Sequence, residues 1–223
     1  MLYIKKLCRE NKGFLAFMLG MLLFRSAVAD WYVVPSGSMY PTIMIGDRVV
    51  ADRLAYDVKL PFTDVIIKHN ADPVRGDIVT FTSPADGVRL VKRLIGVPGD
   101  VIQMRDERLT INGVDLAYQS INGHVELTPD FIGQQLAVNE NVMGKSHATL
   151  QMPGIAAMRS FGPIKVPAGQ YLMLGDNRDY SKDSRYIGLV SRELITGQVT
   201  RVLYSLDEKN YYLPRLNRLG AAL

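Results

Sequence analysis

An apolar segment near the amino terminus most constrains what this chain can fold into. Residues 13–24 form a run of twelve without a charge, which Arg25 interrupts before Asp30 begins the polar remainder. Four basic side chains precede the run, at Lys5, Lys6, Arg9 and Lys12. Because basic residues before an apolar segment hold that end in the cytoplasm, everything from Asp30 onward is predicted to fold outside the cytoplasmic membrane.

Two interpretations of this segment fit its composition. As a membrane anchor, residues 13–29 reach the short end of the roughly 17–25 residues that span a bilayer, and Arg25 lies near the far headgroups. As a cleavable signal peptide, the basic start and the short apolar stretch also fit, and residues 27–29 (AVA) offer a cleavage site. The residues by themselves leave both interpretations open.

The rest of the composition excludes several classes of site. The 223 residues are enough for one sizeable folded body, and the net charge of +4 is too weak to suggest a nucleic-acid partner. It fits anionic lipid headgroups better. The single cysteine, Cys8, excludes an internal disulfide, and the three histidines, His69, His124 and His147, show no metal-ligand spacing. We therefore expect neither a metal nor a cofactor.

Short strand patterns separated by turn residues predict a mainly β protein. Strands are expected at residues 47–52, 77–82, 89–97, 101–104, 109–111, 171–174 and 199–205. Asn112-Gly113 is a strong signal for a two-residue hairpin turn. Residues 128–163 carry glycine, proline and methionine with little periodicity, and this part is expected to be irregular.

A serine-containing turn follows the apolar segment directly. Ser38 lies within residues 35–42 (PSGSMYPT), where Pro35 and Pro41 each fix φ and Gly37 removes a side chain that would block close approach. The pattern predicts a stiff, exposed turn that presents the Ser38 hydroxyl. An inert serine-rich turn is the alternative interpretation.

A serine hydroxyl needs a base within hydrogen-bond reach to become a nucleophile, and Lys92 is the best candidate for that base. In a strand, Leu90, Lys92 and Leu94 share one face, so Lys92 would lie between two leucines. Apolar burial lowers the pKa of a lysine, and a general-base lysine needs a pKa of roughly 7–8. A lysine on a solvated edge strand is the alternative.

A polar loop at residues 175–188 is the third notable element. It can be interpreted as a turn with self-capping side chains, yet it holds two arginines, several carboxylates and two serine hydroxyls within eleven positions. This density suits residues that support a site, with Asp183 and Arg185 paired to fix the loop.

At this point the chain resembles the bacterial type I signal peptidases. Five motifs occur in the order seen in that family: PSGSMYPT at 35–42, GD at 46–47, RGDIV at 75–79, KRLIGVPGD at 92–100 and GDNRD at 175–179. They span most of residues 32–190, and an ordered match of five motifs is far more specific than any single one. Two departures are present: Tyr180 stands where asparagine is usual, and the region between about 105 and 165 is short and lacks a cysteine pair.

The resemblance implies a membrane-bound endopeptidase with a Ser–Lys dyad that removes signal peptides from exported preproteins. Ser38 would be the nucleophile and Lys92 the general base, with the Ser36 hydroxyl in the oxyanion hole. Ser181 would hydrogen-bond and orient the Lys92 amine. The supporting residues would be Gly175, Asp176, Asp183 and Arg185. The residues lining the substrate groove would be Tyr32, Val34, Ile43, Leu90 and Val91.

The resemblance also decides between the interpretations of the apolar segment, because relatives with one such segment keep it as an anchor. We therefore expect residues 1–30 to form a cytoplasmic tail and a single transmembrane anchor in the bacterial cytoplasmic membrane. Residues 31–104 and 166–223 would form the catalytic β core on the exported side, and residues 105–165 a smaller inserted subdomain. Exported preproteins and the lipid bilayer are the expected partners. The alternatives are a membrane-tethered β-rich binding module and a self-cleaving repressor-type peptidase.

Overall fold

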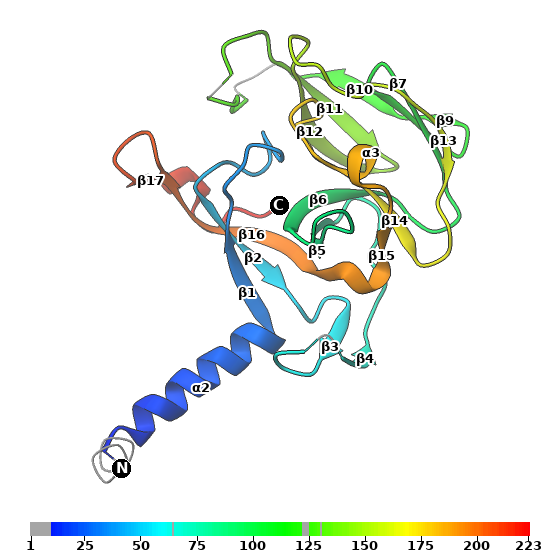
Figure 1. Ribbon diagram of the computed structural model, residues 1–223. Coiled ribbons are helices and arrows are strands. Elements are labelled where there is room, and N and C mark those ends of the chain that lie inside the picture. The colour runs from blue at the N-terminus through cyan, green and yellow to red at the C-terminus, as the bar shows by residue number, and fades with distance from the viewer. Residues whose placement is uncertain (1–9, 64, 122–124, 130) are drawn as a thin grey trace.

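The computed structural model describes residues 10–63, 65–121, 125–129 and 131–223. Lys5, Lys6, Cys8, Arg9 and His124 lie outside the described residues. The chain is mainly β, as predicted, and its strands gather around one large curled sheet with smaller sheets at its margin (Figure 1).

The large sheet has eight strands in the order β1-β2-β16-β5-β6-β14-β15, with β17 paired to β16. These strands are β1 (Ala29–Val33), β2 (Asp47–Asp52), β5 (Ile78–Thr82), β6 (Arg89–Gly96), β14 (Gln170–Leu174), β15 (Val190–Ser191), β16 (Ile195–Asp207) and β17 (Leu213–Pro214). All neighbouring pairs are antiparallel. In β2 buried and partly exposed residues alternate, as expected for a strand with one face on the core.

Three smaller sheets complete the β structure. One contains β10 (Ala117–Ser120), β11 (Leu136–Val142) and β12 (Lys145–Gln151). A second contains β13 (Phe161–Lys165), β7 (Val101–Arg105), β8 (Arg108–Ile111) and β9 (Val114–Asp115). The third is the hairpin of β3 (Asp57–Lys59) and β4 (Ile66–His69). The helices among the described residues are α2 (Lys12–Ala27), α3 (Ser184–Ile187) and the 3-10 turns η1 (Arg192–Leu194) and η2 (Leu216–Arg218).

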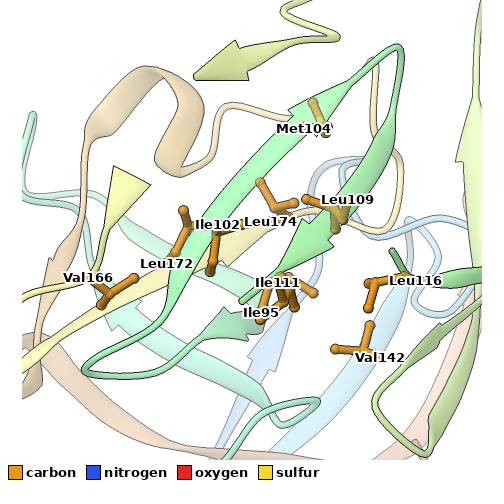
Figure 2. Packing of buried hydrophobic residues seen from close by; sticks show 10 residues of the cluster. All are labelled: Ile95, Ile102, Met104, Leu109, Ile111, Leu116, Val142, Val166, Leu172 and Leu174. Atoms are coloured by element: carbon orange, nitrogen blue, oxygen red, sulfur yellow. The ribbon is translucent and has the colours of Figure 1, made fainter. Parts of the chain in front are cut away.

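A continuous apolar core joins the large sheet to the sheet that contains β7. Figure 2 shows Ile95 of β6 and Leu172 and Leu174 of β14 packed against side chains of β7 and β8. The ten fully packed members are Ile95, Ile102, Met104, Leu109, Ile111, Leu116, Val142, Val166, Leu172 and Leu174. Because this core crosses the sheets, the part around 105–165 is held firmly against the large sheet. The predicted domain boundaries themselves stay a prediction.

Helix α2 projects away from the β structure (Figure 1), and none of its residues is buried. Within the described ranges, no helix combines the length and the apolar character needed to cross a bilayer. At its end the chain turns directly into β1, where Arg25 Nε donates to Asp30 Oδ1 at 2.6 Å and its guanidinium lies 4.7 Å from the Trp31 ring centre.

Most predicted strands are confirmed, with shifts at their ends. The strand at 47–52 matches fully, and the Asn112-Gly113 turn is confirmed by positive φ values of 53° and 79°. The prediction of an irregular segment at 128–163 was wrong, because β11, β12 and the start of β13 lie there. The last predicted strand, 199–205, is also longer than expected, since β16 pairs with β5 before it reaches β2.

Candidate active site

The serine turn (residues 35–42) links β1 to β2 and is held in place by hydrogen bonds to the loop of residues 175–185. The backbone N–H of Asn177 donates to Ser38 O at 3.1 Å, and Asn177 Nδ2 donates to Gly37 O at 3.0 Å. Thr42 Oγ1 donates to Asp176 Oδ2 at 2.6 Å. Met39 and Ile43 are buried beneath the turn in an apolar cluster. The turn is therefore held in one position relative to the loop.

The structure brings Ser38 and Lys92 into contact. Lys92 Nζ lies 2.6 Å from Ser38 Oγ and donates to the carbonyl of Val91 at 3.0 Å. Lys92 sits in β6 opposite Val79 of β5, and it is only 2% exposed. The amine and the hydroxyl are thus poised for proton transfer, a geometry that requires one side chain from each of two distant segments.

The surroundings of Lys92 favour its neutral form. Burial lowers the pKa of the Lys92 amine to about 8, against the opposing pull of the Asp183 and Asp176 carboxylates. The nearby Arg185 guanidinium adds to the lowering. About a tenth of the amine is therefore uncharged at pH 7 and about half at pH 8, which makes it available as a general base.

Asp176 links both halves of the Ser38–Lys92 pair. Arg93, the residue after Lys92, donates from Nε and Nη2 to the two Asp176 carboxylate oxygens at 2.8 and 2.7 Å. Burial would raise the pKa of Asp176, but Arg93 outweighs it and holds the pKa below its usual value. Arg93 is a residue that the sequence analysis missed, and its place beside Lys92 was the available signal.

The predicted pairing of Asp183 with Arg185 is confirmed. Arg185 Nε and Nη2 donate to the Asp183 oxygens, both at 2.8 Å, and the backbone N–H of Gly175 donates to Asp183 at 3.0 Å. Asp183 also caps α3 by accepting from the Arg185 backbone N–H. This carboxylate therefore joins the start of the loop to its end.

Gly175 is required by close packing. A Cβ at this position would lie 2.2 Å from Ser181 Oγ and 2.5 Å from Ser38 O. Both separations are too short for any side chain, so residue 175 must be glycine if the turn and the loop are to meet.

The expected hydrogen bond from Ser181 to Lys92 is not formed, which corrects the sequence analysis. In the described part of the chain, Ser181 Oγ is buried without a hydrogen-bond partner, and its side chain packs beside Gly175. The Lys92 amine is held instead by Ser38 and by the Val91 carbonyl. The physical reason is packing: the Ser181 side chain lies against Gly175, where its Oγ makes no hydrogen bond.

Ser36 is exposed at the mouth of the site, and its Oγ lies 3.5 Å from Ser38 Oγ. Its hydroxyl is therefore near the atom that would attack a carbonyl. A role in stabilising an oxyanion stays a prediction.

An apolar groove of about 380 Å³ runs up to the Ser38–Lys92 pair. All five residues predicted to contact substrate line it: Tyr32, Val34, Ile43, Leu90 and Val91. The curl of the sheet brings β1 close to the start of β6, where Arg89 Nη1 donates to the Tyr32 hydroxyl at 3.0 Å. The groove thus lies between two strands that are not neighbours in the sheet order.

A second buried ion pair, also missed from sequence, ties the loop to the sheet that contains β11. Arg178 donates from Nη1 and Nη2 to the Glu140 carboxylate at 2.7 and 2.6 Å, and both side chains are almost completely buried. The Tyr118 hydroxyl donates to the same carboxylate at 2.7 Å. Glu140 stands in a region without clear periodicity, so no local pattern pointed to it.

Comparison with known proteins gives consistent matches. The family described as "Signal peptidase, peptidase S26" matches residues 9–204. Signal peptidase I of Pseudomonas fluorescens is 35% identical over 97% of this chain and 82% of its own length, and that of Pseudomonas aeruginosa is 31% identical over 96% and 78%. Signal peptidase I T of Bacillus subtilis is 31% identical over 89% of this chain and 86% of its own.

Proposed function

This chain belongs to the signal peptidase family, peptidase S26, and from that premise we propose that it removes signal peptides from exported preproteins with a Ser38–Lys92 dyad. The observation that carries the dyad is the 2.6 Å contact between a buried amine and the hydroxyl of the serine turn. The two alternatives raised by the sequence, a binding module and a self-cleaving repressor, lose their support because the relatives are signal peptidases over nearly the whole chain.

The proposed reaction begins when the neutral Lys92 amine takes the Ser38 proton and Ser38 Oγ attacks the scissile carbonyl. The developing oxyanion would be stabilised by the Ser36 hydroxyl and the backbone N–H of Ser38. Lys92 then gives its proton to the leaving amine, and the acyl-enzyme remains. In the second half, Lys92 takes a proton from water as the water attacks the ester. The bond between Ser38 Oγ and the acyl carbon then breaks, Lys92 returns the proton to Ser38 Oγ, and the signal peptide is released.

The groove supports a preference for small side chains before the cut. An extended segment placed between β1 and β6 would lay alternate side chains against Val34, Ile43 and Leu90. Small pockets along these walls would favour alanine at the first and third positions before the cut.

The pH dependence of cleavage tests the dyad. For a fluorogenic peptide with an Ala-x-Ala site, we expect kcat/KM to rise about tenfold per pH unit below about 8 and to level off above it, because only the neutral amine accepts the proton. Circular dichroism across the same range controls for unfolding. A flat profile between pH 6 and 9 would contradict a lysine base.

We further propose that residues 1–30 form a cytoplasmic tail and a single anchor that holds the catalytic core at the exported face of the cytoplasmic membrane. Large apolar side chains lie on all sides of α2, and the described part of the chain buries none of them; Phe14 and Phe17 are each 63% exposed. A helix that is apolar all round and unburied by protein favours contact with lipid.

Membrane attachment can be tested by flotation of the full chain with liposomes. Leu19→Arg combined with Leu22→Arg is expected to lower the membrane-bound fraction at least tenfold, since each arginine costs about 2.5–3.5 kcal/mol at the centre of a membrane helix. The matched control is Leu216→Arg with Leu219→Arg, two exposed leucines near the C-terminus. Equal flotation of both double variants would contradict the anchor.

A further inference from the structure

A shallow hollow of about 460 Å³ lies next to Ser181 and takes no part in the mechanism above. It is lined by Asp179, Tyr180, Ser181, Lys182 and Tyr186. The two tyrosines are about half exposed, at 52% and 48%, so their rings form an open apolar surface. None of these residues lines the apolar groove.

The wall of the hollow lies close to the backbone of the serine turn. Ser181 Oγ and the backbone carbonyl oxygen of Ser38 both lie within 2.5 Å of the point where a Gly175 Cβ would be. Asp86 lies two residues before the groove residue Val88, and its Oδ2 accepts from Lys182 Nζ at 2.9 Å. The groove and the hollow are therefore separate surfaces that come close to one another at the Asp86–Lys182 contact and along the backbone of the serine turn.

The hollow is built in advance of any ligand. The Tyr186 hydroxyl accepts from the backbone N–H of Met158 at 2.8 Å, and the Arg185 guanidinium lies 5.8 Å from the Tyr186 ring centre. The backbone N–H of Tyr180 donates to Asn177 O at 3.2 Å. Both rings are thus carried by a loop that is already fixed to the site, which reduces the ordering cost of binding.

A peptide cut at Ser38 must extend in both directions from that atom. If its acyl half fills the apolar groove, its amine half extends to the opposite side of Ser38, toward the loop that carries Ser181 and lines the hollow. We propose that Tyr180 and Tyr186 form the site that receives the first residues of the released mature chain and favours apolar side chains there. This inference rests on the proposed function. It also gives a use to Tyr180, the aromatic residue that stands where asparagine is usual.

The test compares two fluorescence-quenched peptides with the same Ala-x-Ala sequence before the cut. One continues with Leu-Phe after the cut and the other with Gly-Gly. The wild-type enzyme is expected to cleave the Leu-Phe peptide with a kcat/KM about tenfold higher, a typical preference of a small apolar site. The ratio of the two values is the readout, because it cancels any general loss of activity.

Tyr180→Ala with Tyr186→Ala is expected to bring the ratio close to one, whereas Tyr180→Phe, which keeps the ring, should preserve it. Tyr211→Ala, an exposed tyrosine on the β16–β17 connection, is the matched control and should leave the ratio unchanged. A wild-type ratio of one, or a ratio that survives the double substitution, overturns the proposal. If the wild-type enzyme cleaves neither peptide, the proposed function itself fails and this inference fails with it.

Discussion

We expect Ser38→Ala and Lys92→Met each to lower kcat/KM for a signal-peptide substrate by about 10⁴-fold or more, because either change would remove one partner of the proposed proton transfer. The Lys92 replacement keeps a similar length and removes a buried amine, so the fold should remain intact. The double variant is expected to be no less active than either single variant, since the two residues act as one unit.

The measurement is single-turnover cleavage of a purified preprotein, with circular dichroism and thermal unfolding on each variant. Lys145→Met is the matched control, because Lys145 is likewise a lysine in a strand. Its amine pairs with the Asp77 carboxylate, and its side chain is 54% exposed. More than about 1% residual activity in Lys92→Met would be inconsistent with general-base catalysis of this size.

Breaking the buried Glu140–Arg178 pair has the largest expected effect on stability. Glu140→Gln should lower the free energy of unfolding by about 3–5 kcal/mol, because it removes the carboxylate that pairs directly with the buried Arg178 guanidinium. The pKa of Glu140 is held below its usual value: burial would raise it, but Arg178 outweighs burial. Urea unfolding at pH 7 gives the free energies.

The double variant Glu140→Gln with Arg178→Met makes this prediction specific. It removes both charges, so it should cost clearly less than the sum of the two single changes. Glu193→Gln serves as the control on an exposed turn, with an expected change within about 0.5 kcal/mol. Additive costs for the two partners would show that the pair does not interact as described.

The parts of the site that could be predicted from the sequence are those whose backbone geometry is determined by neighbouring residues. The prolines and glycine around Ser38, the strand pattern at Lys92 and the turn residues near 112 each determine backbone geometry within a few positions. The strands β11 and β12 were not predicted, because most of their residues are partly exposed on both faces. Their sequences therefore lack the alternation of apolar and polar residues that marks a strand. The hydrogen bond expected of Ser181 failed for a similar reason, since side-chain geometry depends on atoms far away in the chain.

The two buried ion pairs could not be predicted from the sequence for the same physical reason. Arg93 and Asp176 are 83 positions apart, and Glu140 and Arg178 are 38 positions apart. Each pair forms only when separate strands and loops pack together. The local sequence around a carboxylate in a polar stretch is the same whether that carboxylate becomes buried or stays exposed. The family resemblance supplied Asp176 as a supporting residue but not its partner.

The carboxylate of Asp176 accepts from Thr42 of the serine turn with one oxygen and from Arg93, the residue after Lys92, with both. The proposed nucleophile and base are therefore both held by one carboxylate, so a displacement of the loop would carry the two together. An engineer who wished to retarget this protease to other leader sequences could rebuild the walls that face Tyr32 and Leu90 while the reactive atoms keep their spacing.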